Sequence, residues 1–452
     1  MKRIVFCFDG TWNALNADTP TNVVLTAASI VRQTQNGTTQ IIHYDEGVGT
    51  GPVDRLAGGV LGWGLIQNVR EAYRFLIFNY DVGDEIYVFG FSRGAFSART
   101  FVGFLRHVGP LRRLHAARID EALNLYTLRL EGAEGSSERM RRFRADYSSN
   151  VCIDADEDAW RCIYVKDYET GSAPLFSIAY LGLWDTVGAL GVPTIIPMSE
   201  KINRKYAFHD PIVTSFVNSA RHAVAIDEHR TTFPSVLLGD LNALNKSKNM
   251  KSDHPDAPYQ EKWFPGTHGS VGGGGDIRGL SDGALNWVLK GAKRAGLVLD
   301  VEAGSRIHGF KPDALASLVN EINPQFSATQ LIKSDRDGPD QIGLLSAAAI
   351  RRWQTRAGDL PGRKIYRPNT LLKVADALNA LPDPRTNPAD IPLLATHMVV
   401  FGDQLRALAK TYYGDPNKSS LIFAANRDTL DDPDDLFPDD VIRIPKHTEV
   451  IT

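Results

Sequence analysis

Residues 86–94 of the chain read I-Y-V-F-G-F-S-R-G, an apolar run that stops at Gly-Phe-Ser-Arg-Gly. A short apolar run that ends at glycine predicts a buried strand, and apolar residues at helical spacing over 95–107 predict a helix directly after it. Gly-x-Ser-x-Gly between a strand and a helix is the nucleophile elbow, in which Gly90 and Gly94 allow a sharp turn that exposes Ser92. The alternative interpretation is an ordinary glycine-rich turn.

Strand-like and helical stretches alternate along the first three hundred residues. A helical stripe of apolar residues covers 65–80. The strand-like runs are short and bounded by turn residues; they are 4–8, 40–43, 86–89, 176–181 and 235–238. Short buried strands separated by helices indicate a mainly parallel sheet with helices on both faces. The sequence therefore predicts an α/β fold.

Length and composition restrict the class of protein. A chain of 452 residues is too long for one typical compact core, which favours a large domain and a smaller one. The formal net charge is −3 and the basic residues are spread along the chain, which argues against nucleic acid as a partner. None of the cysteines forms a C-x-x-C pair, so a structural zinc site is not expected, and we expect no cofactor.

A nucleophilic serine needs a histidine base and an orienting acid, which follow the serine in the order acid, histidine in α/β-hydrolases. Asp185 stands where the apolar run of 178–190 gives way to glycine, although an aspartate there could also be a turn or N-cap residue. His268 lies in a loop, W-F-P-G-T-H-G-S-V-G-G-G-G-D, that is too glycine-rich for a helix. We expect the triad Ser92, Asp185 and His268.

Other residues compete with this assignment or could support it. His222 is the competing base, but the helical spacing of S-A-R-H-A-V-A-I-D-E-H-R favours a packed position beside the site. The competing acids are Asp227 and Asp276. The expected oxyanion donors are the N–H of Arg93, at the start of the helix, and the loop F-D-G-T-W-N with Gly10 and Thr11. Asp9 could fix this loop by bonding to its backbone, and a metal-binding role for Asp9 is the less expected alternative.

Several further segments converge on one family. The segments V-F-C-F-D-G-T-W-N, Y-D-E-G-V-G-T, G-F-S-R-G-A-F-S-A-R, L-W-D-T-V-G, R-H-A-V-A-I-D-E-H-R, W-F-P-G-T-H-G-S-V-G-G-G and G-L-S-D-G-A-L-N-W-V-L resemble, in this order, an α/β-hydrolase domain family that includes the phospholipase effectors of bacterial type VI secretion. The resemblance runs from Ile4 to about residue 376. It implies hydrolysis of lipid esters, by a phospholipase of A type, with Ser92 as nucleophile, Asp185 as acid and His268 as base. The family usually has aspartate two residues after the histidine, where this chain has Ser270.

The last part of the chain resembles a LysM domain, from about His397 to Pro445. Residues 398–401 read as a strand, Asp403 as the cap of a helix through Tyr412, 417–425 as a second helix and 441–444 as a second strand, so the expected order is β-α-α-β. LysM domains bind N-acetylglucosamine polymers such as peptidoglycan, which the resemblance implies as a partner; a protein carrier of secretion is the alternative.

These observations predict a division of the chain. Residues 1–380 would form an α/β-hydrolase domain with a helical extension at 300–380, and 244–260 would be a surface loop. Residues 381–395 would be a proline-rich linker, because four prolines fall within 381–392. Residues 396–447 would form the LysM-like domain.

The N-terminal apolar run, 4–8, is too short for a signal peptide, and no segment approaches a membrane span. We therefore expect synthesis in the cytoplasm without a signal peptide, export by a specialised secretion system to a target periplasm, and transient contact with a membrane surface. Two rival hypotheses remain open. The chain could be a non-lipid esterase, or a catalytically inactive binding protein targeted by its LysM-like domain.

Overall fold

The computed structural model describes most of the chain. The described residues are 1–10, 18–47, 58–130, 135–188, 213–231, 233–254, 256–301, 312–318, 320, 333–381, 391–400, 403–426, 430, 436 and 441–446. Thr11 and residues 382–390, most of the predicted linker, lie outside them.

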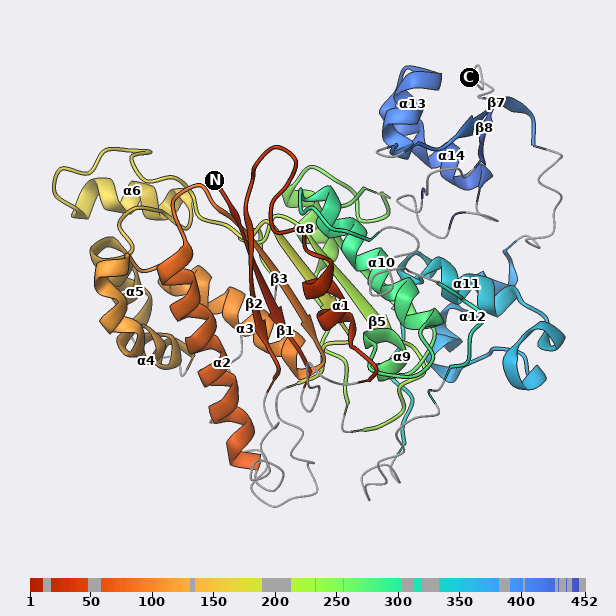
Figure 1. Ribbon diagram of the computed structural model, residues 1–452, viewed down its shortest axis with the longest axis horizontal. Helices are drawn as coiled ribbons and strands as arrows, with labels where there is room; N and C mark the ends of the chain where they lie inside the picture. The colour runs from red at the N-terminus through yellow and green to blue at the C-terminus, as the bar shows by residue number, and fades with distance from the viewer. Residues whose placement is uncertain are drawn as a thin grey trace.

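The main body of the protein is a six-stranded sheet in the order β2-β1-β3-β4-β5-β6, in which every neighbouring pair is parallel. The strands are β1 (Arg3–Phe8), β2 (Gln40–Asp45), β3 (Glu85–Phe91), β4 (Tyr180–Trp184), β5 (Ala220–Ala225) and β6 (Tyr259–Phe264). Helices cover both faces of this sheet (Figure 1). The α/β fold predicted from the alternating pattern is confirmed.

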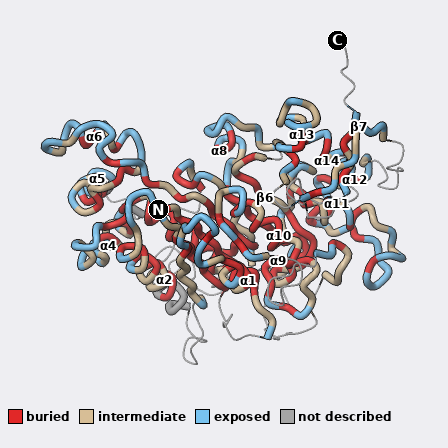
Figure 2. The backbone as a smooth tube through the Cα atoms, turned by 45° about the horizontal axis from the view of Figure 1, so that its top comes forward, coloured by how far each residue is buried: buried red, intermediate tan, exposed pale blue. Residues whose placement is uncertain are grey.

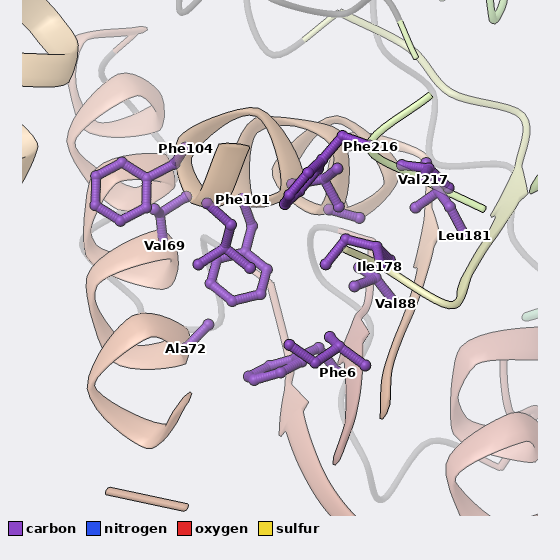
Figure 3. Close-up of a cluster of buried hydrophobic side chains, with 14 of the residues drawn as sticks. Phe6, Val69, Ala72, Val88, Phe101, Phe104, Ile178, Leu181, Phe216 and Val217 are labelled. Atoms are coloured by element: carbon purple, nitrogen blue, oxygen red, sulfur yellow. The ribbon is translucent and has the colours of Figure 1, made fainter. Parts of the chain in front are cut away.

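Both faces of β1, β3 and β4 are buried, which explains why these strands read as apolar runs. On β1, Ile4, Phe6 and Phe8 pack on the side of α2 and α3, whereas Val5 and Cys7 pack on the side of α1 and α10. Figure 3 shows the first of these cores, where Phe6 and Phe101 lie with their ring centroids 4.7 Å apart. The two cores hold the strands rigidly, so the residues at their carboxyl ends have fixed positions.

The helices before residue 300 form the two covering layers. On the α2 side lie α2 (Gly58–Asn79), α3 (Arg93–Val108), α4 (Ile119–Leu130), α5 (Ser136–Tyr147) and the 3-10 helix η1 (Arg113–Arg118), with α6 (Ala155–Tyr164) beyond α5. On the other side lie α1 (Asn22–Ser29) and α10 (Gly279–Arg294). The short helices α8 (Leu241–Ser247) and α9 (His268–Gly272) flank β6. Figure 2 shows buried backbone concentrated along the sheet, whereas α6 is largely exposed.

A third core joins residues 333–381 to the β5–β6 edge. Val224, Ile226 and Trp263 pack there against Leu345 and Trp353 among other apolar side chains. The elements of this segment are η3 (Ile342–Leu344), α11 (Ala347–Gln354), η4 (Ala357–Asp359), η5 (Pro361–Arg363), η6 (Asn369–Val374) and α12 (Ala375–Asn379). The predicted helical extension is thus helical in α11 and α12, while 333–341 forms neither a helix nor a strand apart from an isolated bridge at Lys333.

The C-terminal region contains β7 (Leu393–Met398), α13 (Leu405–Tyr413), η8 (Pro416–Lys418), α14 (Ser419–Ala425) and β8 (Val441–Pro445). The two strands pair antiparallel and share a small core with the helices. The β-α-α-β order agrees with the prediction, but the first strand ends at Met398 instead of beginning there. An ion pair joins this region to the main body, between Arg406 Nε and Asp256 Oδ2 at 3.2 Å.

Four expectations about the main body are wrong or misplaced. The segment around His222 is not helical but the strand β5, because all six of its residues are buried and its polar side chains have buried partners. Residues 235–238 form no strand, and only Ser235 makes an isolated bridge, to Val187. The predicted surface loop 244–260 includes the end of α8 and the start of β6. The strand predicted at 176–181 lies later, at β4.

Candidate active site

Ser92 occupies the turn between β3 and α3, as the Gly-x-Ser-x-Gly pattern predicts. Its backbone has φ 59° and ψ −126°, a strained conformation for a residue with a side chain. A Cβ atom on Gly94 would lie 2.3 Å from the carbonyl oxygens of Phe8 and Asp9, and one on Gly90 would lie 2.6 Å from Ala95 Cα. Both positions therefore need glycine, because the first turn of α3 lies in close contact with the end of β3 at Gly90 and with the end of β1 at Gly94.

Ser92, His268 and Asp185 meet at the carboxyl ends of the strands. His268 Nε2 lies 2.7 Å from Ser92 Oγ, and His268 Nδ1 lies 2.5 Å from Asp185 Oδ2. Ser92 comes from the end of β3, Asp185 directly follows β4, and His268 opens α9 beyond β6. Figure 1 shows α9 at the end of the sheet that is opposite the N-terminus. The three side chains predicted as a triad are thus within hydrogen-bonding distance in the order that a serine nucleophile requires.

His268 begins a one-turn helix, although its glycine-rich surroundings predicted a loop. Its ring lies between two aromatic rings, Phe91 with centroids 4.7 Å apart and Phe233 with centroids 4.9 Å apart. Its backbone N–H donates to Glu228 Oε2 at 3.2 Å. The contacts of the ring with both phenylalanines and the hydrogen bond of its backbone hold the imidazole in place, with Nε2 toward Ser92.

Asp185 is fully buried and sits at φ 37°. Its Oδ1 accepts the Ala225 N–H at 2.9 Å and a hydrogen bond from Arg336 Nη1 at 2.6 Å. Burial by itself would raise the pKa of this carboxyl, but the Arg336 guanidinium and the hydrogen bond with His268 outweigh it and hold the pKa well below the usual range. Asp185 therefore stays ionised, as the acid of a triad requires.

Of the expected oxyanion donors, Arg93 and Gly10 lie among the described residues. Arg93 is the first residue of α3, whose N-terminus points its positive end at the Ser92 turn. The Gly10 N–H donates to Asp9 Oδ1 at 2.6 Å, so in this arrangement it is engaged within its own loop. Thr11 lies outside the described residues.

A family model for the catalytic domain of Tle1-like phospholipase effectors of the type VI secretion system (T6SS) matches residues 2–291. This range is more than half of the chain and contains the whole triad. The chain belongs to the Tle1-like family. The match ends well before residue 376, the limit expected from the resembling segments.

Individual relatives resemble parts of this Tle1-like chain. An uncharacterized protein of Saccharomyces cerevisiae is 27% identical over 264 residues, which are 54% of this chain and 34% of that protein. A potassium binding protein of Escherichia coli is 42% identical over 50 residues, which are 11% of this chain and 34% of that protein. The chain thus spans about a third of the length of each of these curated relatives.

Two solved structures share 17–18% sequence identity with this chain. An uncharacterized protein from Pseudomonas aeruginosa has a TM-score of 0.40, with 84% of this chain and 60% of that chain covered. The Tle1 effector bound to the VgrG spike has a TM-score of 0.31, with 60% and 51% covered.

The residues predicted to support the triad have structural partners of their own. Asp9 is fully buried and accepts hydrogen bonds from Thr21 Oγ1 at 2.6 Å and from Tyr44 Oη at 2.8 Å, besides the Gly10 N–H. Burial and the neighbouring Asp9 raise the pKa of the Tyr44 hydroxyl well above its usual value. Asp9 thus pins the end of β1, where the second oxyanion donor was expected.

His222 and Asp227 make their hydrogen bonds with other partners than Ser92, Asp185 and the His268 ring. His222 Nδ1 lies 2.9 Å from Glu261 Oε2, and His222 Nε2 accepts the Thr186 N–H at 3.1 Å. His222 therefore holds the backbone next to Asp185, which agrees with a position beside the site. Asp227 Oδ2 accepts the Gly266 N–H at 2.7 Å and the Tyr366 hydroxyl at 2.9 Å, which ties the His268 loop to the 333–381 segment.

Ser270 replaces the aspartate that the family usually has in this motif. Its hydroxyl donates to the Leu318 carbonyl at 2.7 Å and lies 3.0 Å from Thr267 Oγ1. It is buried and anchors α9 to a later part of the chain. These contacts are with Thr267 and with the Leu318 backbone, so Ser270 acts on the histidine through the position of α9.

Arg336 is the site residue that sequence reasoning missed. It lies in S-D-R-D-G-P-D, a polar, breaker-rich stretch inside the segment that was predicted as a helical extension. Its guanidinium is nevertheless buried on Asp185, with 6% of the side chain exposed. No local sequence pattern predicts that Arg336 contacts Asp185. The sequence shows only an arginine in a stretch that has neither the helical nor the strand period.

Among the described residues, no group of three or more His, Cys, Asp or Glu side chains is arranged to hold a metal ion. Within the same residues, no helix has the length and apolar character needed to cross a bilayer.

Proposed function

We propose that this Tle1-like chain is a serine hydrolase that cleaves carboxylic esters of lipids, as a phospholipase of A type. The observation that carries the proposal is the relay Ser92 Oγ, His268 Nε2, His268 Nδ1, Asp185 Oδ2, with separations of 2.7 and 2.5 Å. The membership of the Tle1-like phospholipase effector family supports a lipid as the ester substrate.

In the proposed mechanism, Ser92 Oγ attacks the ester carbonyl while His268 Nε2 takes the hydroxyl proton. Asp185 holds the Nδ1–H and stabilises the imidazolium that forms. The Arg93 N–H at the start of α3 stabilises the oxyanion, which for one donor is worth about 3 kcal/mol. His268 then returns the proton to the leaving alcohol, and it activates the water that hydrolyses the acyl-enzyme.

The second oxyanion donor is proposed to come from the loop after β1. Asp9 pins the start of this loop through Gly10, Thr21 and Tyr44. The Gly10 N–H would have to leave Asp9 to serve as a donor. Gly10 and Thr11 are the candidates for this donor.

A fluorophosphonate probe tests the nucleophile. We expect it to label the wild-type chain stoichiometrically and to leave Ser92→Ala unlabelled, because the probe traps an activated serine. Thr100→Ala is the matched control, since Thr100 is a buried hydroxyl of α3 that bonds the Phe96 carbonyl. No labelling of the wild type, or labelling that survives Ser92→Ala, would refute the assignment and favour an inactive binding protein.

The substrate class is tested by comparing phospholipid vesicles with short p-nitrophenyl esters. The proposal predicts release of fatty acid from vesicles by the wild type and no release by Ser92→Ala. Activity on the short esters alone would replace the lipase by a non-lipid esterase. Mass spectrometry of the products identifies the acyl position that is cleaved and so tests the A-type assignment.

The proposed biological setting is that of a secreted antibacterial effector. The family is that of T6SS effectors, so we propose export by the type VI system to a target periplasm and a carrier of that system as partner. The C-terminal β-α-α-β region is proposed as a LysM-like domain for peptidoglycan. Sedimentation of the full chain with purified peptidoglycan tests this, and chain that stays in the supernatant argues for the carrier as the ligand of this region.

A further inference from the structure

Arg336 binds both oxygens of the Asp185 carboxylate. Its Nη1 donates to Oδ1 at 2.6 Å and its Nη2 donates to Oδ2 at 3.0 Å. The same two nitrogens donate to the Ala225 carbonyl at 2.9 Å and to the Phe233 carbonyl at 2.8 Å. The guanidinium therefore joins the acid to the end of β5 and to the segment that packs on the imidazole.

We propose that Arg336 is a positioning residue of the active site. It fixes the plane of the Asp185 carboxylate, and its positive charge offsets part of the negative charge that the carboxylate presents to His268. This inference rests on the proposed serine hydrolase. It makes the segment 333–381, which lies beyond the family match, a necessary part of the catalytic unit.

The hydrogen bonds leave the carboxylate no freedom to rotate. Oδ2 is shared by His268 Nδ1 and Arg336 Nη2, and Oδ1 is shared by Arg336 Nη1 and the Ala225 N–H. A bidentate arginine fixes the plane of a carboxylate as well as its place, which a single donor does not do. The direction of the Nδ1–H bond, and with it the aim of Nε2 at Ser92, is thus set partly by Arg336.

The guanidinium also changes the electrostatics of the relay. A buried carboxylate stabilises the imidazolium that forms when His268 accepts the serine proton. A cation on the same carboxylate opposes this, because it repels the imidazolium and competes for the same oxygen. Loss of the guanidinium should therefore favour the protonated imidazole and move the acid limb of the pH–rate profile to higher pH.

The segment that carries Arg336 is anchored on both sides of it. Before Arg336, the Ser334 N–H donates to the His229 carbonyl at 2.8 Å, and Asp335 pairs with His229 at 2.9 Å. After it, Thr370 Oγ1 donates to the Ile226 carbonyl at 3.0 Å, close to the Tyr366–Asp227 hydrogen bond. The third core buries the apolar residues of the same segment. The packing of the 333–381 segment against the main body therefore places Arg336 at the active site.

The test uses the full chain and the variant Arg336→Met, with hydrolysis of a short p-nitrophenyl ester and fluorophosphonate labelling followed across pH. We expect kcat/KM at the optimum to fall by about ten- to a hundredfold, because the acid loses its fixed orientation. The acid limb should move up by roughly one pH unit. Arg336→Lys keeps the charge but loses the fork, so its acid limb should stay near that of the wild type while its rate falls.

Arg352→Met is the matched control. Arg352 is a buried arginine of the same segment that donates to the Ala314 and Ala316 carbonyls at 2.9 and 2.7 Å. Its loss should lower stability and leave the acid limb in place. Arg336→Met could instead behave like this control, with less folded protein or a lower rate but an unchanged acid limb of the pH–rate profile. In that case Arg336 is only structural and the proposal is overturned. Arg336→Gln replaces Arg336→Met if the methionine variant does not fold.

A second readout does not depend on hydrolysis. The Nδ1 proton between His268 and Asp185 should give a downfield proton NMR resonance that His268→Ala lacks. The pH at which this resonance titrates should rise in Arg336→Met, and an unchanged titration overturns the proposal. If no ester is cleaved and Ser92 is not labelled, the proposed function fails, while this titration still decides the role of Arg336.

Discussion

The main sheet holds two buried histidine–carboxylate pairs with the same chemistry and different surroundings. His268 Nδ1 faces Asp185 at 2.5 Å and His222 Nδ1 faces Glu261 at 2.9 Å. The difference lies at the other ring nitrogen. His268 Nε2 meets the Ser92 hydroxyl, whereas His222 Nε2 accepts the Thr186 N–H. A histidine–carboxylate pair can thus act as a base only where its second nitrogen meets a nucleophile, and elsewhere it is a structural bond.

The largest expected effect is on activity, and it distinguishes His268 from His222. His268→Ala should lower kcat/KM for a short p-nitrophenyl ester by about 10³–10⁴-fold, because the serine loses its base. His222→Ala should lower it by less than about tenfold per folded molecule, through a small shift of the Asp185 turn. Circular dichroism of each purified variant corrects for the folded fraction. A comparable loss in both variants would remove the distinction.

The second effect concerns the acid and its pH dependence. The folded-state pKa of Asp185 lies below its ordinary value, so its contribution to stability is present above about pH 4 and is lost as the pH falls below that value. Asp185→Asn should lower the free energy of unfolding at pH 7 by about 3–5 kcal/mol, because Arg336 loses its buried partner.

Urea unfolding of both proteins at pH 7 and at pH 3 measures this difference. The gap between wild type and Asp185→Asn should narrow at pH 3, because the Asp185 carboxyl of the unfolded wild type is largely protonated there while that of the folded protein stays ionised. A gap that stays constant with pH would show that the charge of Asp185 does not carry the effect.

A smaller effect concerns the structural pair. His222→Ala should lower the free energy of unfolding by about 2–3 kcal/mol, because the buried Thr186 N–H loses its acceptor and Glu261 loses a donor. His222→Gln, which offers both an acceptor and a donor, should recover part of this. Urea denaturation is the measurement, and equal losses in the two variants would point to packing instead of hydrogen bonding.

The smallest effect is expected for a third pair, in the C-terminal region. His397 Nε2 lies 2.8 Å from Asp403 Oδ2 and both side chains are partly exposed. Because water can replace the contact, His397→Ala should lower the stability of this region by no more than about 1 kcal/mol. Ester hydrolysis by the main body should not change. Thermal unfolding followed beside the hydrolysis assay checks both, and a large loss of activity would connect this region to the catalytic unit.

Some of the secondary structure could be predicted because its signals are local. The elbow was correctly placed at Ser92 from a strand, two glycines and a helical stripe, and the helix there begins one residue after the serine. β5 and β6 were missed because their buried polar side chains, such as His222 and Glu261, hide the apolar pattern of a strand. The free-energy cost of burying these polar side chains is offset because His222 and Glu261 bond to each other across the two neighbouring strands.

The sequence by itself determined the α/β class and indicated Ser92 as the nucleophile, because both depend on residues within a few positions of one another. The expected order serine, acid, histidine came from the order known in α/β-hydrolases. The tertiary structure decided which histidine faces Ser92, and it brought Arg336 to Asp185. These contacts join residues 176 and 151 positions apart. Their physical reason is packing, since the two covering cores and the 333–381 segment fix distances between side chains that no local pattern records.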